Sequence, residues 1–168
     1  MEKKKKRVLF LCTHNACRSQ MAEGLLRHHG EKQFEVFSAG TSPSRVHPMA
    51  VEVMEEKGID LTGQRSKSID EFLGQGFDLI VTTCDDARET CPVFPGQAEM
   101  FHWGLEDPAG AEGSREEKLK VFRRGRDELE KLIENAGEDY KKKYKKQIRA
   151  LKMAGGYKIL EDIEITPR

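Results

Sequence analysis

Apolar runs of strand length alternate with segments of helical spacing along most of this chain. The strand-length runs cover residues 8–11, 34–40, 77–83 and 98–103, and their length is typical of buried strands. Helices are predicted from Ser19 to the turn at Gly30 and over residues 48–57, 68–74 and 114–135. Strands that alternate with helices predict an α/β fold, with a central four-stranded parallel sheet and helices on both faces.

Residue types at the predicted helix ends support these boundaries. Ser19 is an N-cap residue, Pro48 suits the first turn of a helix, and Gly58 suits the position just after one. Ser68 and Glu71 predict a capping box for the short helix before the third strand.

The last predicted helix divides the chain into a domain and a basic tail. Its apolar stripe indicates packing against the core and ends near Asn135, so we predict a catalytic domain over residues 1–136 and an extension of unknown role over 137–168. The extension contains a basic stretch at 140–149, which more often forms a solvated helix face than a surface for nucleic acid. The stripe consists of Leu119, Phe122, Leu129, Leu132 and Ile133.

Composition narrows the class of protein. The 168 residues suit one domain, and the 29 basic residues balance the 29 acidic ones, so no net charge points to nucleic acid or an anionic membrane. The basic start is followed by too short an apolar run for a signal peptide, and no apolar stretch would span a bilayer. Four cysteines, spaced C-x4-C and C-x6-C, fit neither a disulfide scaffold nor paired zinc knuckles. We expect a cytoplasmic protein without a bound metal or other cofactor.

Candidate chemistry begins where the first strand ends. The segment from Cys12 to Arg18 joins a strand to a helix, so several backbone N–H groups and the positive end of a helix dipole converge on one point. Such a loop binds a tetrahedral oxyanion, which Arg18 would grip with two N–H groups. The same positive field favours the thiolate of Cys12, to which the Ser19 hydroxyl would hydrogen-bond. The alternative is that Cys12 is a core cysteine and Arg18 a surface charge, but their place between strand and helix favours catalysis.

Two further segments follow later strands of the same sheet. Cys84 comes directly after the third strand, with Cys91 seven residues later, and Asp107-Pro108 follows the fourth. Because ligands of parallel sheets bind at the carboxyl ends of strands, these groups are expected near Cys12. Asp107 would protonate a leaving oxygen, a role that Glu106 would also fit by chemistry alone. Incidental thiols and a simple Asp-Pro turn remain alternatives.

Four segments together resemble the thioredoxin-coupled arsenate reductases, which share their fold with the low-molecular-weight protein tyrosine phosphatases. They are residues 12–23, 38–40, 84–92 and 102–109, and the resemblance runs from about Arg7 to about Asn135. It implies a nucleophile at Cys12, a general acid at Asp107 and two further redox thiols at Cys84 and Cys91. It also implies that Cys17 is structural. The oxyanion would be held by Thr13, His14, Asn15, Ala16, Cys17, Arg18 and Ser19.

In two respects the chain departs from that family, and the first is the extension after Asn135, which goes beyond the usual family length. The second concerns a cation. Some members hold a potassium ion beside the loop, and Asn15, Glu23 and Ser38 fit that pattern. Arg65 and Lys67, however, stand where neutral or acidic ligands would be expected. A lysine ammonium would compete with the ion, so we expect no potassium site.

The resemblance implies arsenate reduction by a thiol relay. Cys12 would attack arsenate, Cys84 would attack the adduct to release arsenite, and Cys91 would capture Cys84 in a disulfide that thioredoxin reduces. A phosphatase using Cys12, Arg18 and Asp107, with phosphate as its oxyanion, is the main alternative. It has no use for Cys84 and Cys91. A non-catalytic phosphate- or redox-sensing protein is the third hypothesis. We expect a monomer.

Overall fold

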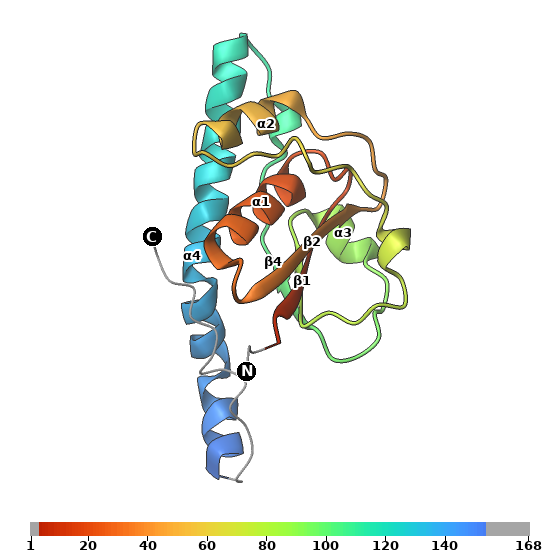
Figure 1. The fold of residues 1–168 in the computed structure, drawn as a ribbon, viewed down its shortest axis with the longest axis vertical. Coiled ribbons are helices and arrows are strands. Elements are labelled where there is room, and N and C mark those ends of the chain that lie inside the picture. The colour runs from red at the N-terminus through yellow and green to blue at the C-terminus, as the bar shows by residue number, and fades with distance from the viewer. Residues whose placement is uncertain (1–3, 154–168) are drawn as a thin grey trace.

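The computed structural model describes the backbone of residues 4–153 and the side chains of residues 4–135. Figure 1 shows the fold and labels most of its elements. In chain order the elements are β1 (Lys6–Cys12), α1 (Arg18–Gly30), β2 (Phe34–Gly40), α2 (Pro48–Glu55), η1 (Ile69–Phe72), β3 (Leu79–Thr82), α3 (Asp85–Thr90), β4 (Glu99–His102), η2 (Pro108–Gly110) and α4 (Arg115–Met153).

The four strands form one parallel sheet in the order β2-β1-β3-β4. β1 is therefore central, and its last residue, Cys12, pairs with Gly40 at the end of β2. All four strands end at the same edge, so the segments that follow them gather there. The predicted four-stranded parallel sheet is confirmed, although β3 and β4 are shorter than their apolar runs.

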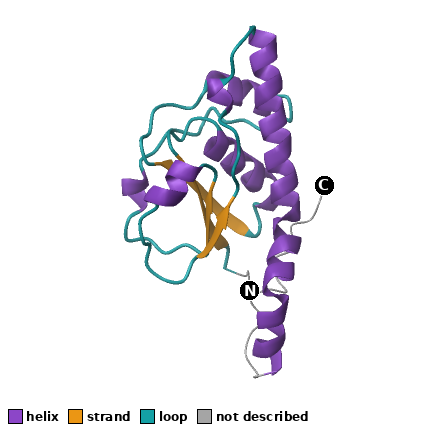
Figure 2. Ribbon diagram, turned by 180° about the vertical axis from the view of Figure 1, so that it is seen from behind, coloured by secondary structure: helices purple, strands orange, loops and turns teal. Residues whose placement is uncertain are grey.

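Helices cover both faces of the sheet, as predicted. Figures 1 and 2 show α1 and α4 on one side of the strands and α3 on the other. Alternate residues of β1 separate the two cores: Val8 and Phe10 pack in the cluster that holds α1, α2 and α4. Leu9 and Leu11 pack in the cluster that holds η1 and α3. This alternation follows from the two-residue period of a strand.

Two predicted helix boundaries are wrong, and one predicted cap is only partly formed. α1 begins at Arg18 after Cys17 as N-cap, so Ser19 lies inside the first turn. Ser68 is the N-cap of η1, as predicted, but its hydroxyl accepts from the backbone N–H of Asp70 rather than that of Glu71. The Glu71 carboxylate accepts from the backbone N–H of Ser68 and also pairs with the side chain of Arg65, so only the Glu71 half of the predicted capping box is present.

α4 does not end near Asn135 but continues to Met153, a length of 39 residues. The prediction took Ile133 as the last apolar residue of the stripe, but Tyr140, Tyr144, Ile148 and Leu151 continue the helical spacing in the sequence. The predicted division at residue 136 therefore falls inside a helix. The alternating pattern at 157–165 lies outside the described residues. None of the helices within residues 4–153 is long and apolar enough to cross a bilayer.

Candidate active site

The loop between β1 and α1 wraps around the thiol of Cys12, which is 2% exposed. The backbone N–H of Asn15 donates to its Sγ over 3.2 Å, and the Ser19 hydroxyl lies 2.8 Å from the same atom. The hydrogen bond predicted between Ser19 and Cys12 is thus present. Both groups bring a hydrogen-bonding partner to the sulfur.

Asn15 is the centre of the loop's buried hydrogen bonds. Its φ of 48° lies in the left-handed region, which costs a non-glycine residue roughly 1–2 kcal/mol. Its Nδ2 donates to the hydroxyls of Ser19 (2.7 Å) and Ser38 (3.0 Å). Its Oδ1 accepts from Nε2 of Gln20 (2.8 Å) and from the backbone N–H of Lys67 (2.9 Å). These four bonds satisfy the amide and hold the strained turn in place.

Gly40 gives the loop room to pass over the end of β2. A Cβ at this position would stand 2.6 Å from the carbonyl oxygen of Thr13 and 2.8 Å from the nitrogen of Asn15, closer than such contacts ever are. Both are backbone atoms, so relief would require the whole loop to move. The loop therefore depends on the absence of a side chain at Gly40.

Arg18 connects this loop to the segment after β4. The guanidinium is buried; its Nη1 donates to the carbonyl of Leu105 over 3.1 Å, and its Nη2 lies 3.6 Å from Oδ2 of Asp107. Asp107 is held by the N–H of Ala109, which donates to Oδ1 over 3.0 Å, and its side chain remains 41% exposed. An accessible carboxylate beside the arginine is well placed to exchange a proton with an oxyanion.

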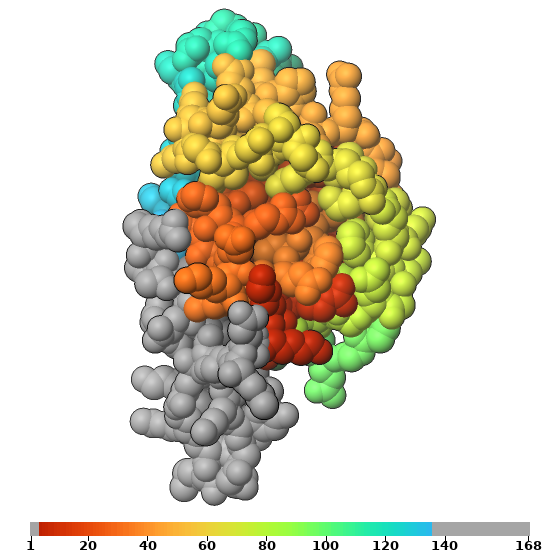
Figure 3. Space-filling view, viewed as in Figure 1, coloured from red at the N-terminus to blue at the C-terminus, as the bar shows by residue number. Residues whose placement is uncertain are grey.

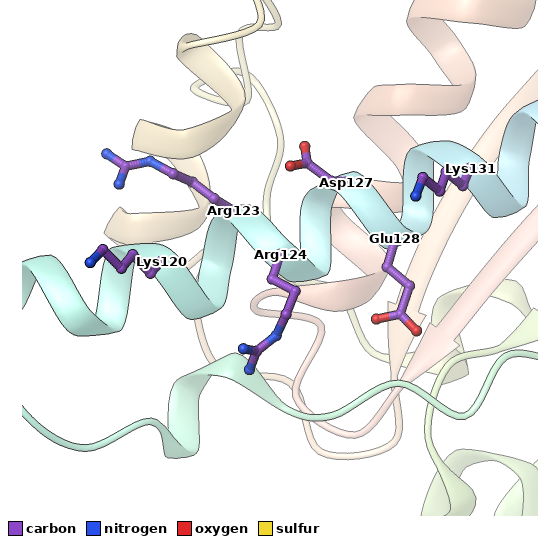
Figure 4. A pocket seen from close by; sticks show the side chains of 6 residues that line it. All are labelled: Lys120, Arg123, Arg124, Asp127, Glu128 and Lys131. Atoms are coloured by element: carbon purple, nitrogen blue, oxygen red, sulfur yellow. The ribbon is translucent and has the colours of Figure 1, made fainter.

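Glu106 is directed elsewhere. Its carboxylate lies 3.5 Å from the guanidinium of Arg124 on α4. Figure 4 shows Arg124 reaching from α4 toward the segment that contains η2. The geometry therefore favours Asp107 over Glu106 as the acid. The same face of α4 carries Lys120, Arg123, Asp127, Glu128 and Lys131.

Cys84 reaches the Cys12 loop from the neighbouring strand. It is the N-cap of α3, where its Sγ accepts from the N–H of Ala87 over 3.4 Å, and the Thr13 hydroxyl lies 3.3 Å from that sulfur. Cys91 caps the other end of α3 and is half-buried, and this burial raises the pKa of its thiol. All four cysteines are free thiols in the structure.

Cys17 differs from these three cysteines. It is buried in the core cluster under the loop. Burial, with smaller contributions from Asp107 and Cys12, raises the pKa of its thiol to about 12. A thiol that stays protonated near neutral pH is a poor nucleophile.

His102 is a residue to which the sequence pattern alone assigns no role. Its Nδ1 lies 2.8 Å from the Thr82 hydroxyl, and its Nε2 lies 2.9 Å from Oδ1 of Asp85, the first residue of α3. The imidazole thus ties β4 to the start of the helix between Cys84 and Cys91. The sequence feature that could have identified His102 is its position at the carboxyl end of a predicted strand.

Comparisons with known proteins agree with this geometry. The family model of the low molecular weight phosphotyrosine protein phosphatases matches residues 7–147. The chain belongs to that family. The arsenate reductase of Halalkalibacterium halodurans is 49% identical over 134 residues, which make up 80% of this chain and 96% of that protein. The arsenate reductase of Bacillus subtilis is 45% identical over 122 residues, or 73% of this chain and 88% of that protein.

Solved structures from both branches of the family share the fold. An arsenate reductase in the phosphate-binding state is 38% identical, with a TM-score of 0.64 over 78% of this chain and 95% of that one. A low molecular weight protein tyrosine phosphatase from T. tengcongensis is 32% identical, with a TM-score of 0.65 over 80% of this chain and 99% of that one. The resemblance to arsenate reductases and the phosphatase-like fold are both confirmed.

Proposed function

We propose that this protein is an arsenate reductase that works by a relay of three thiols, with phosphate as an analogue of its substrate. One observation carries the proposal: Cys84 lies at the oxyanion loop itself, its thiol in contact with Thr13. A phosphatase needs only water as its second nucleophile. A second thiol at this place serves a reaction in which sulfur is oxidised.

The first step forms a bond between sulfur and arsenic. The Cys12 thiolate attacks arsenic(V), while Arg18 and the loop N–H groups hold the remaining oxygens. The departing oxygen takes a proton from Asp107 and leaves as water. This step does not change the oxidation state of arsenic.

The second step reduces arsenic. The Cys84 thiolate attacks Sγ of Cys12, the sulfur–arsenic bond breaks, and its electron pair leaves with arsenic as arsenite. Two thiols have become a Cys12–Cys84 disulfide, and arsenic(V) has become arsenic(III). The Cys91 thiolate then attacks Cys84, which frees Cys12 and leaves a Cys84–Cys91 disulfide. An external dithiol, for which we propose thioredoxin, reduces that bond by exchange. Such a reductant places the protein in the cytoplasm, and we expect it to act as a monomer.

The test is arsenate-dependent consumption of reductant, measured with thioredoxin and its reductase and, separately, with glutathione and glutaredoxin. We expect arsenite to form only with the thioredoxin system. Cys12→Ser, Cys84→Ser and Cys91→Ser should each abolish multiple turnover. Cys17→Ala is the matched control, since it removes a cysteine of the same loop that the relay does not use. Full turnover by Cys84→Ser would contradict the relay.

Phosphatase activity is the second candidate, because Cys12, Arg18 and Asp107 also suit phosphoryl transfer and a tyrosine phosphatase shares the fold. An aryl phosphate distinguishes the two functions. Hydrolysis should require Cys12 and survive in Cys84→Ser. If hydrolysis is rapid and arsenite never forms, the protein is a phosphatase.

A further inference from the structure

A cationic side chain occupies the place beside the loop where some relatives are expected to hold potassium. The ammonium of Lys67 lies 3.7 Å from Oε1 of Glu23 and donates to the carbonyl oxygen of Arg65 over 2.9 Å. A carboxylate and a backbone carbonyl are the oxygens that a hard cation would take. Because both already face a positive charge, these residues do not fit a potassium ion.

Glu23 needs a cation at this point. It lies on α1 with its side chain only 4% exposed, and a buried carboxylate without a partner is strongly unfavourable. Arg27 also approaches it, at 3.6 Å, but the Arg27 side chain is half exposed, whereas that of Lys67 is only 12% exposed. Figure 3 shows the segment after α2, in yellow, next to the orange-red atoms of α1. Lys67 follows in that connection and supplies the cation from within the protein.

Hydrogen bonds join this ion pair to the catalytic loop. The backbone N–H of Lys67 donates to Oδ1 of Asn15. Nε2 of Gln20 bridges the same Oδ1 to the Arg65 carbonyl (2.9 Å), which also accepts from the Lys67 ammonium. Asn15 in turn donates its backbone N–H to Cys12. The position of the ammonium therefore bears on the shape of the loop.

We infer that the Lys67 ammonium is a built-in replacement for a free monovalent cation. Lys67 is then a positioning residue: its charge neutralises Glu23 and draws in the Arg65 carbonyl, and this holds Asn15 and the oxyanion loop in their binding shape. The inference rests on the proposed role of that loop as an oxyanion site. Its functional consequence is that oxyanion binding does not depend on which monovalent cation is in solution.

The first test needs only the wild-type, full-length chain. Phosphate affinity is measured by the rise in melting temperature with phosphate concentration, in potassium, sodium and choline chloride at equal ionic strength. We expect the same affinity in all three salts. Tighter binding in potassium than in choline would overturn the inference. If phosphate does not bind in any salt, the loop is not an oxyanion site, and the inference is wrong as well. If only the reaction with thioredoxin is missing, the proposed relay is wrong, but the salt comparison still tests the inference.

The second test uses a variant whose phosphate affinity should depend on the monovalent cation in solution. Lys67→Ser removes the ammonium but leaves the carboxylate and carbonyl oxygens, so phosphate affinity should fall roughly tenfold in choline and recover in potassium. Lys57→Ser is the matched control, because it removes an ammonium 3.5 Å from Glu130, away from the loop. It should show no response to the choice of cation.

A double variant separates charge from simple packing. Glu23→Gln with Lys67→Met carries neither charge, so no cation should alter its phosphate affinity. Three results would overturn the inference: unchanged affinity of Lys67→Ser in choline, a loss that no cation restores, or restoration in the double variant as well.

Discussion

The hydroxyl of Thr13 lies 3.3 Å from the thiol of Cys84, although 71 positions separate the two residues in the chain. Thr13 follows Cys12, the proposed nucleophile, and Cys84 is the thiol proposed to attack the sulfur of Cys12. This contact joins the ends of β1 and β3 at the carboxyl edge of the sheet. It places the first two sulfurs of the relay around one loop before any substrate binds.

Thr13→Val should slow the second step of the relay and leave the first intact. The hydroxyl is positioned to donate to a Cys84 thiolate, and one hydrogen bond of this kind contributes about 0.5–1.5 kcal/mol. We expect up to about a tenfold slower formation of the Cys12–Cys84 disulfide. It is measured by acid quench and mass spectrometry after one addition of arsenate, in a Cys91→Ser background. Thr13→Ser, which keeps the hydroxyl, should react at the original rate; equal loss in both variants would assign the effect to packing.

Closure of the Cys84–Cys91 disulfide should unwind α3. The two cysteines cap opposite ends of the helix, and seven residues of helix separate their Cα atoms by about 10.5 Å, whereas a disulfide needs them within about 7 Å. Ala87 is the only buried residue of α3, so unwinding exposes little apolar surface. We expect the oxidised protein to lose hydrogen-exchange protection between Cys84 and Cys91. The Cys91→Ser variant should stop after one turnover with Cys12 bonded to Cys84. Because it cannot form the Cys84–Cys91 disulfide, its α3 should keep its hydrogen-exchange protection before and after oxidation.

Gly40→Ala should weaken oxyanion binding without touching any catalytic side chain. The added methyl group meets the backbone of Thr13 and Asn15, and overpacking of this kind costs about 1–3 kcal/mol. The measurement is phosphate affinity by thermal shift. Gly63→Ala is the matched control, since its added Cβ meets nothing within 4 Å. Unchanged phosphate affinity in Gly40→Ala would show that the loop tolerates displacement.

His47 should make the protein less stable below about pH 6.5. Its Nδ1 accepts the N–H of Met49 at the start of α2, and burial lowers the pKa of the imidazole, although Asp107 partly opposes the shift. The folded state therefore binds fewer protons than the unfolded state. This stabilisation is complete above the ordinary pKa and is lost as pH falls through the lowered one.

His47→Asn tests this pH dependence, because asparagine also caps a helix but does not titrate. Its melting temperature should fall less than that of the wild type between about pH 7.5 and about pH 5.5, a range in which most carboxylates stay charged. His28→Asn, a change at an exposed imidazole, should behave like the wild type. The backbone N–H of His47 also donates to the carbonyl of Ala16 in the oxyanion loop. Phosphate affinity should therefore decline over the same pH range.

Local patterns in the sequence determined the architecture and the chemistry of the site. Length and residue type indicated strands for the four strand-length segments, and Cys12 and Arg18 flank a strand-to-helix junction whose geometry follows from chain order alone. Cys84 was assigned to the same edge because parallel strands end together. These conclusions needed only periodicity and connectivity, which are properties of neighbouring residues.

Contacts between distant residues were decided by the tertiary structure. The choice of Asp107 over Glu106 depends on which carboxylate faces Arg18 and which faces Arg124, and the two are adjacent in sequence. The pairing of Lys67 with Glu23 depends on how the segment after α2 lies next to α1. The end of α4 was missed for a different reason: the end of one apolar stripe near Asn135 was taken as the end of the helix, which continues to Met153. Packing in the folded protein decides which of several chemically similar side chains makes a given contact. Neighbouring residues in the sequence do not determine that choice.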